Sequence, residues 1–253
     1  MRDPVGLQIQ FASEQFIDAL AAETGTDPVE FRLKHLTDER DRAVVKAAAD
    51  KSGWNASSKP RAKRRGAILK GRGIAYAQRG GTVLAVVAEI EAEPKTGRIW
   101  GRKFTVAHDC GLVVNPQGLR HTIEGGLVQG PSRALFEEVK FDTDMVTSAD
   151  WGSYPILEMS DAPETIDIVL INRPELAPTG AGEATCRVIP AALANAFFYA
   201  TGVRLRHAPM TAENVKKALA LVASTAANGG ALPPSGTRVC FWLTPIWRVV
   251  TLH

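Results

Sequence analysis

The chain has 253 residues, of which 45% are apolar and 23% are charged, so it can bury a core and is not a wholly disordered protein. No run approaches the ~18 consecutive apolar residues of a membrane helix, and the N-terminus has no apolar stretch typical of a secretory signal. We therefore expect a cytoplasmic protein, with the periplasm as the alternative. The three cysteines, Cys110, Cys186 and Cys240, are widely spaced, which excludes a disulfide framework and a CxxC metal site.

The formal net charge of +3 conceals one basic segment. No acidic residue lies between Asp50 and Glu89, and this interval holds nine basic residues, so the remainder has a net charge of 3 − 9 = −6. These nine are Lys51, Lys59, Arg61, Lys63, Arg64, Arg65, Lys70, Arg72 and Arg79. The run 59–72 lacks the interleaved aromatic residues of a nucleic-acid site. It is interpreted as a solvated loop or as a strip facing an acidic partner.

The first fifty residues have helical periodicity. The first predicted helix ends at Gly25, and its apolar face is formed by Phe11, Ala12, Gln15, Phe16, Ala19 and Leu20. Asp27 followed by Pro28 predicts the start of a second helix, because an N-cap acid and a proline at the first helical position favour initiation. A third helix is predicted over residues 41–52, ending at Gly53.

After Gly73 the apolar period changes from 3.6 to 2, which predicts strands. Residues 82–93 and 99–107 form a predicted hairpin around a Pro-Lys-Thr-Gly turn, with the acidic side of the first strand facing water. The later predicted elements are a helix over 117–138, strands over 145–154 and 165–171, a helix opened by Pro190 that runs to Gly202, and a helix over 211–223.

These elements divide the sequence into four segments. Residues 1–54 form a helical segment, 55–72 a basic linker, 73–223 a mixed domain of strands and helices, and 224–253 an irregular tail. From residue 225 the tail loses periodicity and carries Trp242 and Trp247 in a short apolar stretch. It is interpreted as a non-native, out-of-frame end, with a linker followed by a docking segment as the alternative.

One candidate for chemistry is the segment 178–183 (PTGAGE), between a strand and a helix. Two glycines just before an acid allow a ligand to approach the backbone and direct the carboxylate of Glu183 into a cleft. An ordinary strand-to-helix turn has the same composition. The motif alone therefore leaves both interpretations open.

A second candidate is the predicted helix 117–138, which places small residues at intervals of four. These are Gly118, Thr122, Gly126 and Gly130. Glycine costs about 1 kcal/mol in a helix interior, so this face indicates the close approach of another backbone. Pro131 is expected to break or kink the helix beside Gln129, an amide that could contact a ligand.

A third candidate is His108-Asp109-Cys110 at the end of the predicted hairpin. Alternate residues of a strand point to opposite faces, so His108 and Cys110 cannot share a side with Asp109. The sequence has no second cluster to complete a zinc site. We interpret these three residues as structural.

In this order, the motifs resemble the large subunit of the xanthine dehydrogenase/aldehyde oxidase family of molybdenum hydroxylases, of the isoquinoline 1-oxidoreductase or nicotinate dehydrogenase type. The segments that carry the resemblance are FASEQFIDALAAETGTDPVEFRLKHL, GRGIAYAQRGGTVLAVVAEIEAEPKTGRI, VAHDCGLVVNPQGLRHTIEGGLVQG, SYPILEM, VLINRPELAPTGAGEA and ATGVRLR. They extend from residue 2 to about residue 220. The resemblance implies the α+β fold of a molybdopterin-binding domain, with a helical N-terminal segment followed by mixed strands and helices.

The resemblance also implies site residues and a reaction. Glu183 matches the catalytic glutamate of the GxGE motif, and Gly182, Gln129 and Arg2 are implied to contact the cofactor. The cofactor is molybdenum–molybdopterin, in its cytosine dinucleotide form in bacterial members. The substrate is an N-heterocyclic aromatic compound or an aldehyde, water supplies the oxygen, and Glu183 acts as general base. Partial burial that raises the pKa of this glutamate would suit that role.

The sequence departs from the family pattern at three points. It reads RDPVG where RAPGG is expected, and Ala184 stands where a proline usually follows the glutamate. Family large subunits are also much longer, so the chain resembles their C-terminal part. Its partners would be the upstream half of the large subunit and a small [2Fe–2S] subunit, since three cysteines cannot hold one such cluster. The alternative is a catalytically empty fragment that acts as a binding module.

Overall fold

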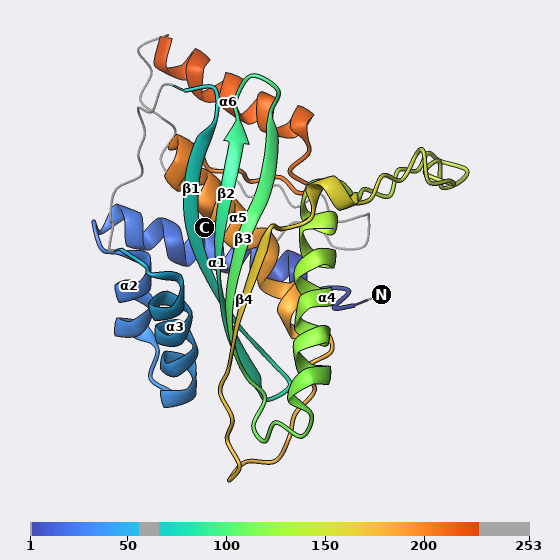
Figure 1. The fold of residues 1–253 in the computed structure, drawn as a ribbon. Coiled ribbons are helices and arrows are strands. Elements are labelled where there is room, and N and C mark those ends of the chain that lie inside the picture. Colours follow the sequence, from blue (N-terminus) through green and yellow to red (C-terminus); the bar gives the residue numbers. More distant parts are fainter. Residues whose placement is uncertain (1, 56–65, 228–253) are drawn as a thin grey trace.

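The computed structural model describes residues 2–55 and 66–227, and the tail from residue 228 lies outside the described residues. One mixed sheet in the order β1-β2-β3-β4 runs through this part of the chain, with helices on both of its faces (Figure 1). The strands are β1 (Leu69–Arg79), β2 (Thr82–Glu93), β3 (Arg98–Asp109) and β4 (Thr165–Leu170). The first three strands are antiparallel, and β4 pairs parallel to β3.

Asp27 starts one N-terminal helix and Gly53 ends another as predicted, whereas the third helix begins at Glu39 instead of residue 41 and the first ends at Glu23, before Gly25. These helices are α1 (Gly6–Glu23), α2 (Pro28–His35) and α3 (Glu39–Ser52). The side chain of Asp27 accepts hydrogen bonds from the N–H groups of Val29 and Glu30, as expected of an N-cap. Gly53 ends α3 in the left-handed conformation, which glycine adopts without steric cost.

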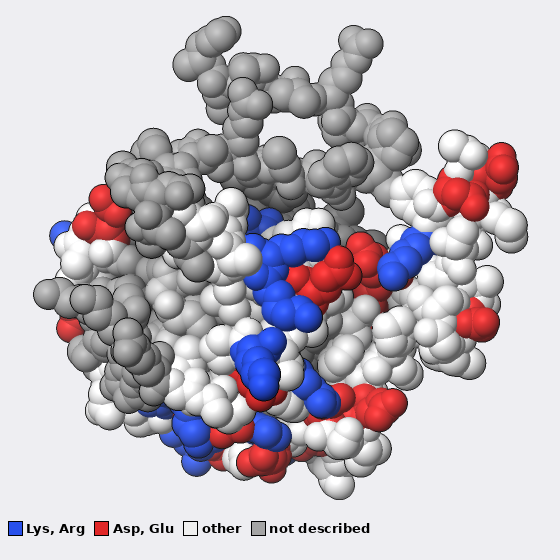
Figure 2. All heavy atoms as spheres, turned by 90° about the horizontal axis from the view of Figure 1, so that it is seen from above, with Lys and Arg blue, Asp and Glu red and all other residues white. Residues whose placement is uncertain are grey.

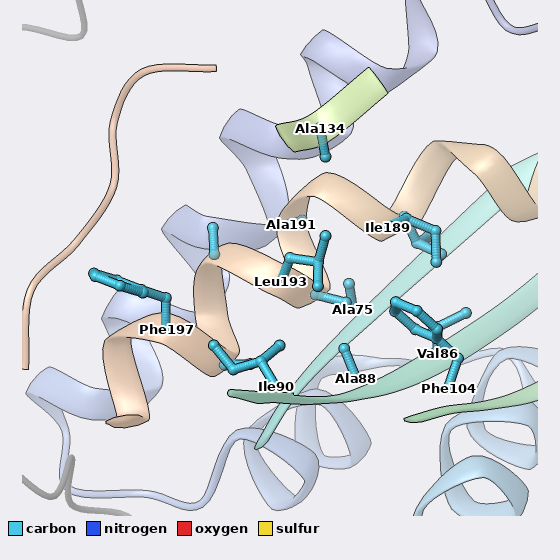
Figure 3. Packing of buried hydrophobic residues seen from close by; sticks show 14 of the residues in the cluster. Ala75, Val86, Ala88, Ile90, Phe104, Ala134, Ile189, Ala191, Leu193 and Phe197 are labelled. Atoms are coloured by element: carbon cyan, nitrogen blue, oxygen red, sulfur yellow. The ribbon is translucent and has the colours of Figure 1, made fainter. Parts of the chain in front are cut away.

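Two apolar clusters cover the two faces of the sheet. Helix α3 packs on β2 and β3 on one face, where Val44 and Ala48 lie against Ala85 and Val87. On the other face lies α5 (Ala184–Thr201), whose buried residues pack against β1 and β2 together with Phe104 (Figure 3). Both faces of the central part of β2 are therefore buried.

A close approach between α5 and β1 fixes the position of that helix. A Cβ atom at Gly73 would lie 2.2 Å from the backbone nitrogen of Ala196 and 2.5 Å from the carbonyl oxygen of Ala192. Real side chains do not tolerate such distances, so glycine at residue 73 allows the helix to lie directly on the strand. The start of α5, which carries Glu183, is positioned by this contact.

Helix α4 (Pro116–Leu135) packs on α5 through the small-residue face that the sequence predicted. A Cβ atom at Gly126 would lie 3.0 Å from Thr185, and one at Gly130 only 2.6 Å from Ile189. The interpretation of these glycines as helix-packing positions is confirmed. The helix does not break at Pro131 but continues to Leu135, so the predicted break is wrong.

Four other predictions of the sequence analysis need correction. Residues 145–154 form no strand, and only an isolated bridge joins Phe141 to Val146. Pro190 does not open its helix, because α5 begins at Ala184 and carries the proline in its interior. Residues 69–72 of the expected linker lie in β1. The last helix, α6 (Ala212–Ala227), extends four residues beyond its predicted end and takes in the first residues of the expected tail.

The buried face of α1 also differs from the prediction. Phe11 and Gln15 are buried as expected, but the side chain of Phe16 is 61% exposed. The face that packs on α5 instead includes Glu14 and Asp18. Periodicity missed these two acids, because their burial depends on arginines from elsewhere in the chain: Glu14 pairs with Arg32 at 2.8 Å, and Asp18 pairs with Arg204 at 2.7 Å.

Candidate functional site

The segment that carries Glu183 leads directly into α5. Glu183 occupies the N-cap position of this helix, but its side chain makes no capping hydrogen bond. The segment is anchored to β2 because the hydroxyl of Thr82 donates to the carbonyl oxygen of Gly180 at 2.9 Å. The carboxylate therefore does not cap the helix that follows it.

An open pocket of about 380 Å³ lies beside this segment. Its lining residues are Arg2, Arg79, Gly80, Gly180, Gly182 and Glu183. No atom lies within 4 Å of the position that a Cβ atom would take at Gly180 or Gly182. A ligand in the pocket can therefore approach the backbone on this side.

The structure brings Arg2, Gly182 and Glu183 together in this pocket, whereas Gln129 does not line it. The side-chain oxygen of Gln129 lies 3.7 Å from the sulfur of Cys186, which is buried in the first turn of α5. Arg2 is held on the α4 side, because Arg133 donates to its carbonyl oxygen at 2.6 Å. Arg2 and the segment with Gly182 and Glu183 thus meet in the pocket from two distant parts of the chain, while Gln129 contacts α5 at Cys186.

Both oxygens of the Glu183 carboxylate accept hydrogen bonds. The N–H of Asp3 donates to Oε2 at 2.5 Å, and Nη2 of Arg79 donates to Oε1 at 2.5 Å. These two donors lower the pKa of Glu183 below its ordinary value, the N–H of Asp3 making the largest contribution. The expected increase in pKa is therefore wrong for this structure, in which the carboxylate is only half-buried and is held in its ionised form.

Sequence reasoning missed three residues of the site, which are Asp3, Arg79 and Arg187. The carboxylate of Asp3 accepts two hydrogen bonds from Arg187, at 2.7 and 2.8 Å. Arg79 was counted only as part of the basic segment, and Asp3 only as a departure from the expected RAPGG. That departure was the available signal, because it places an acid where the family pattern has a small residue.

His108, Asp109 and Cys110 form no reactive cluster. Burial lowers the pKa of His108 to about 4, so its fully buried ring is neutral at physiological pH. The carboxylate of Asp109 is held by Arg40 at 2.7 Å and by Arg173 at 3.0 Å. In the described part of the chain no group of three or more His, Cys, Asp or Glu side chains could hold a metal ion. These contacts support the structural interpretation.

Three residues in the described part of the basic segment, Lys70, Arg72 and Arg79, pair with acids. Lys70 lies 2.9 Å from Glu91, and Arg72 lies 3.5 Å from Glu89. In the view from above, Lys and Arg side chains lie beside Asp and Glu side chains near the middle of the face (Figure 2). Residues 59–65 lie outside the described residues. In the described part of the run 59–72, basic side chains lie next to acidic ones.

Comparison with known proteins identifies the class of this domain. Residues 75–163 match the family model described as a molybdopterin cofactor-binding domain. Together with the relatives described next, this match shows a molybdopterin cofactor-binding domain similar to that of large subunits in the xanthine dehydrogenase and aldehyde oxidoreductase family.

The relatives support this class. The chain is 41% identical over 228 residues to one of the subunits of nicotinate dehydrogenase from Pseudomonas putida, a match that covers 87% of this chain and 19% of that protein. It is 34% identical over 207 residues to the beta chain of isoquinoline 1-oxidoreductase from Brevundimonas diminuta, covering 80% of this chain and 25% of that protein. The chain thus spans between a fifth and a quarter of the length of these relatives.

The fold is shared with a solved enzyme. The aldehyde oxidoreductase of Desulfovibrio gigas superposes with a TM-score of 0.72 at 17% sequence identity, over 87% of this chain and 41% of that structure. At an identity this low, the structural similarity shows a common fold and nothing more. None of the helices in the two described ranges is long and apolar enough to cross a membrane.

Proposed function

We propose that this chain supplies the glutamate-bearing wall of the active site in a molybdenum hydroxylase that oxidises an N-heterocyclic aromatic compound or an aldehyde with water as the oxygen source. Glu183 is the general base in this proposal. The observation that carries it is the convergence of Arg2, Gly182 and Glu183 on one open pocket.

The residues present fit one side of a molybdopterin site. The cofactor is anionic through its phosphate, and Arg2 provides a cation in the pocket. Gly180 and Gly182 leave room for a ligand against the backbone, and the amide of Gln129 can donate or accept a hydrogen bond. The same proposal includes the cytosine dinucleotide form of the cofactor, the small [2Fe–2S] subunit and the remaining half of the large subunit.

Glu183 would act by accepting a proton at a carboxylate oxygen. When bound, the molybdenum cofactor supplies the redox chemistry that a protein side chain cannot. The carboxylate is ionised at neutral pH, as a proton acceptor must be, although the two donors that lower its pKa also make it a weaker base. Arg79, the donor to Oε1, lies in the same pocket and can stabilise negative charge there.

Replacement of Glu183 in the complete, molybdenum-loaded enzyme tests this role. Glu183→Gln keeps the size of the side chain but removes the proton acceptor, and loss of a general base costs about 10²–10⁴ in rate. We expect that loss in the reductive half-reaction, with much less effect on substrate binding. The control is Glu175→Gln, at an exposed residue outside the pocket. Molybdenum content is measured first, and a rate within about tenfold of the parent would refute the catalytic assignment.

The alternative, a catalytically empty binding module, is separated by metal analysis of the assembled protein. Stoichiometric molybdenum that depends on the presence of this chain supports the enzyme. A stable assembly that never contains molybdenum supports the empty module.

A further inference from the structure

The Glu183 carboxylate is held from outside its own helix. The donor to Oε2 is the backbone of Asp3, in the N-terminal segment, and the donor to Oε1 is the side chain of Arg79, the last residue of β1. Helix α5 contributes neither bond. The orientation of this side chain therefore depends on how two distant segments meet the start of α5.

Asp3 adopts a conformation that only strong local contacts can maintain. Its φ angle is +47°, in the left-handed region that non-glycine residues rarely occupy, although aspartate tolerates it better than most. Its side chain is only 1% exposed. A Cβ atom at Gly6 would lie 2.1 Å from the Asp3 carboxylate, so the chain packs tightly around it. Such backbone conformations persist where the surroundings over-determine them.

The contacts that hold Asp3 come from two arginines. Arg187 binds its carboxylate through two hydrogen bonds, and Nε of Arg79 lies 3.8 Å from Oδ1. Arg187 lies four residues after Glu183 near the start of α5, so the two side chains share one side of that helix. The result is an alternating chain of charges, Glu183–Arg79–Asp3–Arg187, with no net charge. Arg2 is the further charged side chain that lines the pocket.

We propose that Arg79 and Asp3 are positioning residues for Glu183, and that Arg187 acts through Asp3 by fixing the direction of its N–H. The contacts around Glu183 do not depend on the proposed function, but their role in catalysis rests on Glu183 being the general base. The clamp formed by Asp3, Arg79 and Arg187 keeps the glutamate ionised and fixed in direction while leaving it beside the open pocket. A base that must meet a bound substrate needs this fixed geometry.

The clamp has a measurable consequence in the chain itself. With the 253-residue chain labelled with ¹³C at the glutamate carboxyl groups, the signal of Glu183 is assigned by its loss in Glu183→Gln. We expect the parent signal to titrate below the ordinary glutamate midpoint of about 4.3. The midpoint should move to higher pH in Arg79→Gln and in Asp3→Ala, which lose one donor and the anchored backbone respectively.

Conservative and matched variants separate positioning from general destabilisation. Arg79→Lys keeps the positive charge and should retain much of the low midpoint. The matched control is Arg98→Gln, because the two arginines are alike in exposure and pairing distance. Arg98 is 48% exposed and pairs with Asp161 at 2.5 Å, and Arg79 is 42% exposed and pairs with Glu183 at 2.5 Å. Arg98→Gln should leave the Glu183 titration unchanged. Far-UV circular dichroism tests whether each variant is folded. If Arg79→Gln does not fold, Arg79→Lys is used in its place.

The outcomes decide the clamp independently of catalysis. A Glu183 midpoint that is ordinary in the parent, or that is the same in Arg79→Gln, Asp3→Ala and the parent, overturns the inference. In the loaded enzyme, the acidic limb of the kcat/KM profile should move to higher pH in the same two variants and not in Arg98→Gln. If the titration shifts while Glu183→Gln remains active, the clamp stands and the assignment of Glu183 as general base fails.

Discussion

Asp109 lies at the end of β3 and connects two distant parts of the chain through its buried carboxylate. Arg40, from α3, and Arg173, which follows β4, both bind it, and the N–H of Gly111 donates to it at 3.0 Å. Burial raises the pKa of Asp109, but these donors outweigh that effect and leave it lowered. The fully buried carboxylate of Asp109 is tolerated because two arginines and one backbone N–H donate hydrogen bonds to it.

Removing that charge should destabilise the fold. We expect Asp109→Asn to lower the free energy of unfolding by about 3 kcal/mol, because two arginines lose a charged partner at a buried point. Asp167→Asn is the matched control, since Asp167 is 28% exposed and pairs with Lys103 at 2.9 Å, and exposed pairs contribute about 1 kcal/mol or less. Urea unfolding at neutral pH measures both. Equal, small effects of the two substitutions would contradict the importance of the Asp109 contacts.

The contribution of Asp109 should also depend on pH. Its pKa is lower in the folded chain than in the unfolded chain, where it is about 3.9. The stabilisation is therefore fully present above pH about 4 and is lost as the pH falls through the folded-state value. The difference in unfolding free energy between the parent and Asp109→Asn should shrink on acidification below that point. A difference that stays constant down to pH 3 would show that the effect is not electrostatic.

At the scale of elements, the contact between α4 and α5 depends on the absence of side chains. Gly126 and Gly130 allow α4 to approach Thr185 and Ile189. Glycine lowers helix stability by about 1 kcal/mol relative to alanine, so its use here is explained by packing. This contact also places Gln129, on α4, close to Cys186 in the first turn of α5.

Adding one methyl group should disturb this contact. In Gly130→Ala the new Cβ atom would lie 2.6 Å from Ile189, and overpacking costs about 1–3 kcal/mol, more than the gain in helix propensity. We expect a lower thermal midpoint, by about 2–4 °C for each kcal/mol lost. Gly125→Ala is the control in the same helix, because its nearest neighbour is Arg2 at 3.5 Å. It should be neutral or stabilising, and a similar loss in both variants would refute close packing as the cause.

At the scale of the whole molecule, the candidate site is open on one side. The pocket is bounded by Arg2, Arg79 and the segment that ends at Glu183, and the chain corresponds to a fifth to a quarter of the length of its relatives. In a site with one such wall, much of a bound molybdopterin would face water. Binding that depends on a few hydrogen bonds exposed to water is weak.

We therefore expect the isolated chain to bind no molybdopterin tightly. Reconstitution with cofactor followed by gel filtration and molybdenum analysis tests this expectation. The matched sample is the same chain assembled with the remaining part of a large subunit, which should retain the cofactor. Co-elution of one molybdenum per isolated chain would contradict the prediction.

The sequence by itself determined the start of α2, the end of α3, the β2–β3 hairpin and the packing role of Gly126 and Gly130 in α4. These features depend on local chemistry: Asp27 and Pro28 start a helix, Gly53 ends one, and Gly97, with a φ angle of +80°, closes the hairpin turn. The family resemblance likewise followed from motifs in order along the chain. It also supplied the residues that the structure gathers near one pocket.

Only the tertiary structure decided which charges are buried and which groups meet Glu183. Glu14 and Asp18 face the protein interior because arginines from distant segments neutralise them. Glu183 meets Asp3 and Arg79, which are 180 and 104 residues away. No periodicity or local spacing encodes such contacts, because the pairing partners are set by how the segments pack in space. The reaction that the resemblance implies favours a raised pKa for Glu183, whereas its partners in the folded chain lower it.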